Sequence, residues 1–266
     1  MELIVKSLRA MALVVAATVM FVLGVAFYVA SDAALSPSSL GASSDLSQAA
    51  RWLQFVAALV GLCAVCRAGW EIVLRRDWPP AAEIAAVALG ALLVTIGWLT
   101  IAADSDPGGA VVSAVGVGVW SLLALSRAAR TSLAERGARG GLAELWLVAA
   151  GGLFVFAIGY GLTSAANSRG PAVAADCLEA VGIAALTGSL YLARSRGRLR
   201  ARPVTGVLLG LALLAVSYLA TAIVTAITIS SLTALGAALA VTTALALAGA
   251  VLLGLAAWTR VTELHP

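Results

Sequence analysis

The sequence has few charged residues for its length. Only 11% of its 266 residues are Asp, Glu, Lys or Arg, whereas 62% are hydrophobic, and the mean hydropathy is +1.03. A soluble domain carries roughly 25% charged and about 45–50% apolar residues. The composition therefore excludes a soluble globular fold, because a polar surface cannot cover so many apolar side chains. We expect the lipid bilayer to be the main solvent.

Lysine and histidine are nearly absent, with Lys6 and His265 the single examples. No lysine lies in an apolar stretch, which excludes a retinal Schiff base. One histidine beside the C-terminus excludes haem held by paired imidazoles and a Ser/His or Cys/His catalytic couple. A GxxxxGK[ST] motif is missing too. We therefore expect no catalytic residues, no cofactor and no metal site, and we do not expect an enzyme.

Cysteine is also scarce: Cys63, Cys66 and Cys177 are too few for a disulfide framework. Cys63 and Cys66 have the spacing of a redox pair. They lie in a continuous hydrophobic run, without the strand-to-helix turn that such motifs occupy. We interpret them as small hydrophobic side chains.

Proline is missing from every long apolar stretch. A proline inside such a stretch would break or kink a membrane helix, so the pattern predicts intact helices. It also counts against a transporter built on interrupted helices. The seven prolines, all between the stretches, are Pro37, Pro79, Pro80, Pro107, Pro171, Pro203 and Pro266.

Eight apolar segments of about 20 residues or more are present, each long enough to cross a bilayer. They predict an all-α, polytopic membrane helix bundle with eight transmembrane helices and a single integral membrane domain, 1–266. The segments are Leu8–Ala30, Ala49–Leu74, Ala82–Ala103, Ala110–Ala129, Leu142–Ala166, Ala172–Ala193, Val204–Ile229 and Leu232–Thr259.

The basic residues predict the orientation. With the N-terminus inside, 15 of the 17 lysine and arginine residues fall in the inner segments, and only Arg51 and Arg169 fall outside. The positive-inside rule then predicts cytoplasmic N- and C-termini. The Arg194–Arg202 run is interpreted as an anchor to lipid headgroups, and no nucleic acid partner is expected. The Ala-, Gly- and Arg-rich composition suggests a bacterial inner membrane.

Similar segments recur in order along the chain. Phe21–Gly24 resembles Phe156–Gly159, and Ala50–Gln54 parallels Ala175–Glu179. Four segments separate the copies, so they would share orientation, as parallel repeats with halves 1–139 and 140–266. Apolar sequence also produces such matches by chance, and the duplication is left open.

A candidate polar cluster is formed by Arg51, Gln54, Asp176 and Glu179. Arg51 and Gln54 share one helix face, as do Asp176 and Glu179. Ionisable groups in a membrane segment tend to face one another or a wet cavity. We expect Arg51 to pair with Asp176 or Glu179, in an outward-facing polar vestibule. The alternative is that all four lie at the interface within reach of headgroups.

A candidate helix-packing face carries small and weakly polar side chains, which let another helix approach closely. A hydroxyl-lined pore is the alternative reading. The face consists of Gly206, Gly210, Ser217, Thr221 and Thr225.

Three functions remain open. An accessory or scaffold subunit of a membrane complex is favoured, with other membrane proteins or a second copy as partner. The alternative is a small-molecule, lipid or ion transporter. A lipid-acting enzyme is third, and it rests on Asp104 and Asp106, which have the DxD spacing of metal-dependent enzymes but also suit an ordinary turn.

Overall fold

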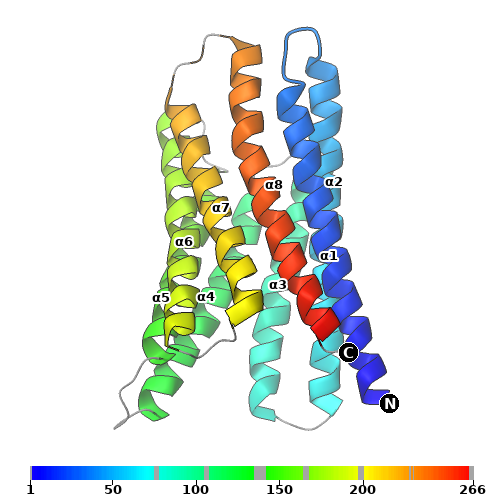
Figure 1. The fold of residues 1–266 in the computed structure, drawn as a ribbon, viewed down its shortest axis with the longest axis vertical. Helices are drawn as coiled ribbons and strands as arrows, with labels where there is room; N and C mark the ends of the chain where they lie inside the picture. Colours follow the sequence, from blue (N-terminus) through cyan, green and yellow to red (C-terminus); the bar gives the residue numbers. More distant parts are fainter. Residues whose placement is uncertain are drawn as a thin grey trace.

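The computed structural model describes residues 2–74, 78–104, 108–134, 142–163, 168–196, 201–227, 229 and 231–263. In this part of the chain all eight helices are long and apolar enough to cross a membrane, which confirms the predicted all-α, eight-span bundle (Figure 1). The helices are α1 (Glu2–Ala33), α2 (Leu40–Leu74), α3 (Trp78–Asp104), α4 (Gly108–Ala134), α5 (Leu142–Thr163), α6 (Arg169–Ser195), α7 (Ala201–Ala226) and α8 (Leu232–Glu263).

Several helix ends differ from the predicted ones. The largest difference is at α2, which begins at Leu40 rather than near Ala49, and α7 ends at Ala226 rather than at Ile229. The hydropathy window missed the first turns of α2 because they are polar, with three serines and an aspartate before residue 48. Helical hydrogen bonding needs no apolar side chains, so a helix extends past its hydrophobic segment.

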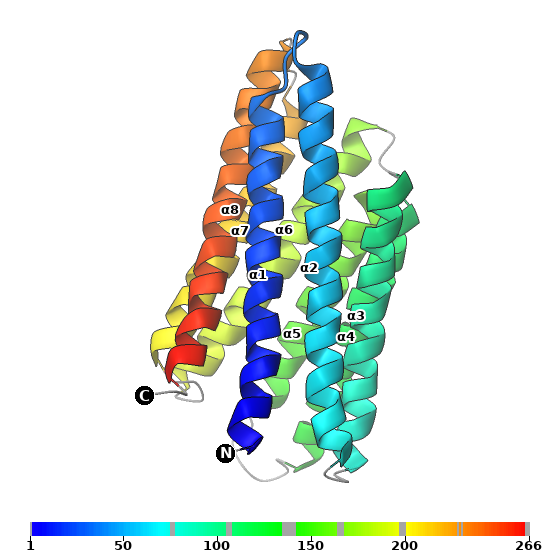
Figure 2. The ribbon, with the colours of Figure 1, turned by 90° about the vertical axis from the view of Figure 1, so that its right-hand side faces the viewer.

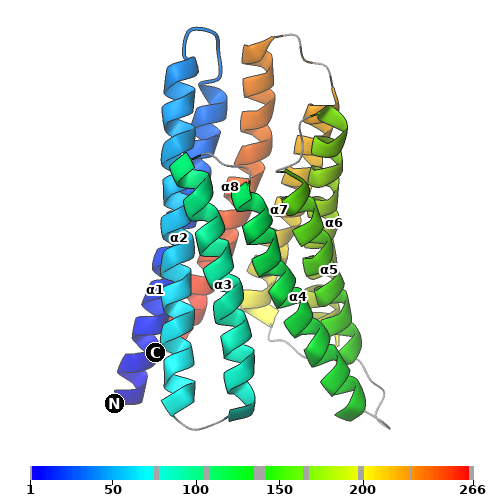
Figure 3. The same ribbon diagram turned by 180° about the vertical axis from the view of Figure 1, so that it is seen from behind.

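The helices form a closed ring in chain order. Among the described residues each helix packs only against the preceding and the following one, and α8 packs against α1. Figures 1 and 3, from opposite sides, show α7 and α8 on one side of the ring and α3 and α4 on the other. Figure 2 shows α8, α1, α2 and α3 next to one another. Both chain ends lie at the same end of the ring (Figure 1).

Every helix of such a ring has an outward and an inward face. On α3 the exposed side chains Leu89, Leu92 and Ile96 follow helical spacing and form an outward stripe. A residue two positions away is rotated by about 200° and therefore points inward. Val94 is such a residue. The inward faces consequently meet inside the ring.

Short hydroxyl groups join neighbouring helices. Ser121 of α4 donates a hydrogen bond to the carbonyl oxygen of Ala150 on α5 at 2.8 Å, and Ser217 of α7 donates to that of Thr242 on α8 at 2.7 Å. Lipid is as apolar as leucine, so helix association in a bilayer depends on close packing and on such bonds.

Candidate functional site

Glu179 is the most deeply buried ionisable side chain for which the structure gives exposure, with 2% of its surface accessible. It lies three residues from Gly182, the midpoint of α6, which is about 4.5 Å along the helix axis. Its Oε1 atom has no hydrogen-bond partner among the described residues. A buried polar atom without a partner is costly, and an ionisable group inside a membrane protein is a candidate functional site.

The backbone of α5 approaches Glu179 closely because α5 carries a glycine at the contact. A methyl group on Gly159 would lie 2.8 Å from the carbonyl oxygen of Ala175 and 2.9 Å from Cγ of Glu179. Any larger residue would push α5 and α6 apart. Gly159 therefore determines where the carboxyl group of Glu179 lies.

A connected set of aromatic side chains from the two helices beside α6 reaches this carboxyl group through Tyr218. The hydroxyl group of Tyr218 on α7 hydrogen-bonds to Glu179. The Tyr218 ring meets that of Phe156 on α5 edge to face, with centroids 6.3 Å apart. The Phe156 ring also stacks on that of Tyr160, with centroids 6.0 Å apart. Glu179 is thus flanked by aromatic rings from both α5 and α7.

Tyr160 links these groups to the opposite side of the ring. Its hydroxyl group hydrogen-bonds to Ser113 of α4 and lies within electrostatic range of Glu179 and of Tyr28 on α1. Helices α1 and α5 do not pack against each other in the described structure. Tyr28 and Tyr160 therefore approach one another across the interior of the ring.

Further charged groups lie near these side chains. Asp176 is within electrostatic range of Glu179, and Arg51 hydrogen-bonds to Tyr28. Thr243 of α8 donates a hydrogen bond of 2.6 Å to Oδ2 of Asp32 on α1. We name this set the interior polar cluster: Tyr28, Asp32, Arg51, Ser113, Tyr160, Asp176, Glu179 and Tyr218.

Two of the four predicted cluster residues lie well within their helices. Arg51 lies 11 residues from the start of α2, about 16 Å along its axis. Glu179 is buried, with 2% of its surface accessible. Helices α2 and α6 are not neighbours in the ring, so an ion pair between Arg51 and Asp176 or Glu179 would have to cross the interior. That pair stays a prediction.

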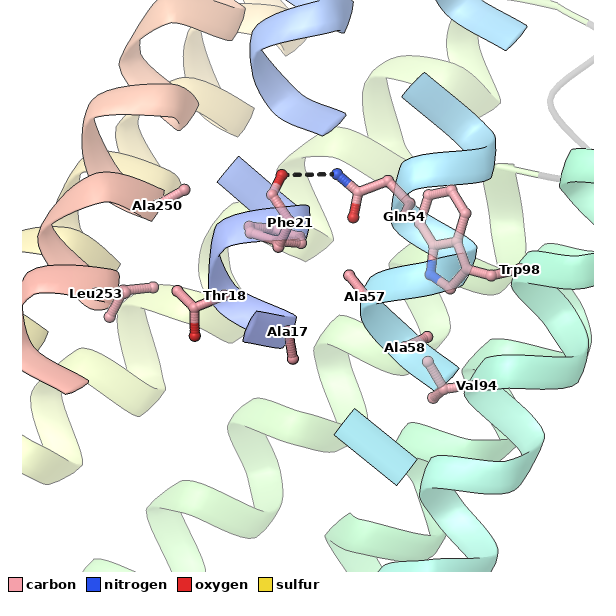
Figure 4. Close-up of a pocket in the computed structure, with 10 residues that line it drawn as sticks. All are labelled: Ala17, Thr18, Phe21, Gln54, Ala57, Ala58, Val94, Trp98, Ala250 and Leu253. Atoms are coloured by element: carbon pink, nitrogen blue, oxygen red, sulfur yellow. Dashed lines mark hydrogen bonds between the residues drawn. The ribbon is translucent and has the colours of Figure 1, made fainter. Parts of the chain in front are cut away.

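Gln54, the fourth predicted residue, lies at the α1–α2 contact. Its side chain is 4% exposed and donates a hydrogen bond of 3.3 Å to the carbonyl oxygen of Phe21. It lines a cavity of about 380 Å³, which we call the mid-ring cavity. Figure 4 shows Gln54 and Trp98 on one side of this cavity and Ala250 and Leu253 on the other.

A second cavity of about 520 Å³, the lower cavity, is lined by residues of five successive helices, α3 to α7. It lies toward the end of the ring that holds the termini, because most of its residues are nearer that end of their helices. Its wall is apolar apart from Ser189 and Arg127. The guanidinium of Arg127 forms an ion pair with Glu83 and lies 5.7 Å from the centre of the Trp146 ring. Both cavities have volumes typical of small-molecule sites.

The predicted packing face lies mainly against α8. A methyl group on Gly210 would lie 2.8 Å from the carbonyl oxygen of Gly249, and one on Gly206 would lie 3.2 Å from Cβ of Ala256. Ser217 and Thr221 both hydrogen-bond to Thr242. Thr225 is partly exposed, one turn further along α7.

The other candidate residues from the sequence lie outside the interior polar cluster or outside the described part of the chain. Asp106 falls in residues 105–107, outside the described part of the chain. Cys63 and Cys66 are exposed on α2 as free thiols. In the described ranges no group of three His, Cys, Asp or Glu side chains converges as metal ligands would.

The three tyrosines of the interior polar cluster were not singled out as site residues from the sequence. Their apolar helices carry no polar pattern that marks them. Only the exposures in the structure show that Tyr218, two residues from the exposed Val216, is on the opposite face of α7. The helix that each tyrosine contacts depends on the order of the helices in the ring. That order cannot be read from the sequence of a single helix.

Comparison of the chain with protein-family models, with curated proteins and with solved structures found no match. Its function is therefore argued from the site.

Proposed function

We propose that this chain is a membrane transporter that binds a small positively charged solute inside the helix ring, with Glu179 as the binding carboxylate. The observation that carries the proposal is the buried Oε1 atom of Glu179, which lacks a hydrogen-bond partner among the described residues. A cation at this point would satisfy the oxygen and offset the cost of burying the charge.

The surroundings support this reading. Glu179 is near the middle of α6. The mid-ring and lower cavities are each large enough to hold more than one water molecule. Ser113, Tyr160 and Tyr218 supply hydroxyl groups that exchange hydrogen bonds as a solute enters or leaves. All the helices are uninterrupted, so movement would come from rearrangement of whole helices.

The accessory-subunit reading favoured by the sequence remains a proposal as well. Intact helices and small-residue contacts suit it, but they are needed by any helix bundle in lipid. It offers no reason to keep a buried carboxyl group beside the α5–α6 contact. For that reason the transporter is the better-supported function.

The distribution of basic residues supports a bacterial cytoplasmic membrane with both termini inside. Arg127, Arg130 and Arg196 lie toward the end of the ring that holds the termini, paired with Glu83 or Glu144. In this orientation the lower cavity would be nearer the cytoplasm.

The test is charge movement in proteoliposomes on a solid-supported membrane. Separate concentration jumps of protons, Na⁺, K⁺ and benzyltrimethylammonium are applied to the wild type, Glu179→Gln and Asp45→Asn, the last changing an exposed carboxylate on α2. We expect a current for at least one cation in the wild type and in Asp45→Asn, and a loss of about tenfold or more in Glu179→Gln.

Equal currents in the wild type and Glu179→Gln, or no current above empty liposomes, would overturn the transporter proposal. Purification in mild detergent tests the accessory reading in parallel. A chain that purifies alone as a monomer leaves that reading without support.

A further inference from the structure

The surroundings of Glu179 differ from those expected for a hydrated inorganic ion. Phe156, Tyr160 and Tyr218 form a continuous set of rings with centroid separations of 6.0 and 6.3 Å. Aromatic faces attract cations, most strongly where water is excluded. Inorganic cations instead require several oxygen ligands to replace their water. A carboxylate flanked by rings therefore suits a cation with a weakly held hydration shell.

The lower cavity continues the same helix faces. Leu153 is three residues from Phe156 on α5, Leu186 is seven from Glu179 on α6, and Leu211 is seven from Tyr218 on α7. Seven residues correspond to two helical turns, about 10 Å. All three leucines lie on the side of the rings nearer the termini. An apolar cavity of about 520 Å³ thus lies on the same helix faces as the aromatic and carboxylate groups, displaced from them toward the termini.

These two observations together assign a solute class. We propose that the solute is a lipophilic organic ammonium ion, with its charged end between Glu179 and the rings of Phe156, Tyr160 and Tyr218, and its apolar body in the lower cavity. The inference rests on the proposed function and specifies its substrate. The one cationic side chain of the cavity wall, Arg127, is paired with Glu83 and does not face the ligand as an isolated charge.

The experiment is equilibrium binding to the full chain in detergent, measured by calorimetry and by the emission of Trp120 and Trp146, which line the lower cavity. The probes are benzyltrimethylammonium and its neutral isostere neopentylbenzene. Glu179→Gln removes the charge, Phe156→Leu removes a ring but keeps an apolar side chain, and Phe154→Leu is the control. Phe154 is on the same helix but is 58% exposed on the outward face.

We expect the wild type and Phe154→Leu to bind the ammonium probe equally, and Phe156→Leu to bind it about three- to thirtyfold more weakly. Glu179→Gln should lose about tenfold or more in affinity for the ammonium probe but not for the neutral one. Size-exclusion profiles verify that each variant is folded.

Binding of the neutral isostere as tightly as the ammonium ion, or unchanged affinity in Phe156→Leu, would overturn the inference. A Glu179-dependent current of protons, Na⁺ or K⁺ without any binding of the ammonium probe would also reject it, while the proposed transport function would stand. Neither binding nor current would reject both.

Discussion

Glu179 packs against Gly159 in the same way as Gln54 packs against Gly24. A methyl group on Gly24 would lie 2.8 Å from Nε2 of Gln54 and 3.3 Å from the carbonyl oxygen of Ala50. On Gly159 it would lie 2.9 Å from Cγ of Glu179 and 2.8 Å from the carbonyl oxygen of Ala175. The α1–α2 and α5–α6 pairs therefore pack in one register, at the positions where the sequence segments recur.

The matching packing of the α1–α2 and α5–α6 pairs supports the proposed pair of four-helix repeats. The chemical difference between Gln54 and Glu179 at the matching position is therefore informative. One half carries a neutral amide that bonds to its own neighbour, and the other carries a carboxyl group with one oxygen that has no hydrogen-bond partner in the described part of the chain. The packing contact does not require the charge. Packing therefore leaves the carboxyl group of Glu179 unexplained, and the proposed ligand would account for it.

The first prediction concerns the α5–α6 contact. Gly159→Ala should lower the free energy of unfolding by roughly 1–3 kcal/mol, because the added methyl group overpacks the interface. Gly151→Ala on the same helix is the control, since nothing lies within 4 Å of its added methyl group. Thermal unfolding in detergent, followed by tryptophan emission, measures both. Equal unfolding temperatures for the two variants would refute the close contact.

The second prediction concerns Glu179 and Gln54, each replaced by the residue type found at the other position. Glu179→Gln should leave the unfolding temperature unchanged or raise it, because the other half accommodates glutamine in the same setting. Gln54→Glu should destabilise the chain by roughly 2–3 kcal/mol by burying a charge without a partner. The same unfolding assay applies. A strongly destabilised Glu179→Gln would indicate that the carboxyl group has a structural role instead.

The third prediction concerns closure of the ring. The 2.6 Å hydrogen bond from Thr243 to Asp32 joins α8 to α1. Thr243→Val should cost about 0.6–1.7 kcal/mol. Thr100→Val is the control, because among the described residues the Thr100 hydroxyl group bonds to Ile96 of its own helix and to no other helix. In a double-mutant cycle with Asp32→Asn the losses should be less than additive, and strict additivity would mean that the two side chains do not interact.

The fourth prediction tests orientation. In a chain whose three native cysteines are replaced, Ser38→Cys in the α1–α2 turn should react with a membrane-impermeant maleimide on intact cells. Ser195→Cys at the end of α6 should react only after the membrane is permeabilised. Both serines are exposed in the structure and lie toward opposite ends of the ring. The reverse labelling pattern would invert the proposed topology.

The number of spans and the class of fold were predictable from sequence alone. Transfer of a segment into lipid depends on the sum of its own side chains, so a sliding window finds it without knowledge of its neighbours. The same locality explains the error at Leu40, where polar helical turns precede the apolar segment. It also explains why Gln54 and Glu179 could be singled out, as polar residues in apolar runs.

The tertiary structure decided what those residues meet. Lateral association in a bilayer has little hydrophobic driving force and is determined by where small residues let backbones approach, as at Gly24 and Gly159. That contact geometry sets the ring order, brings Tyr218 and Phe156 beside Glu179, and turns Tyr28 toward Tyr160 across the interior. The sequence by itself determined that a carboxyl group lies in an apolar segment, because hydropathy is a property of the segment alone; the packing of the ring determined that this group is buried and bonded to Tyr218.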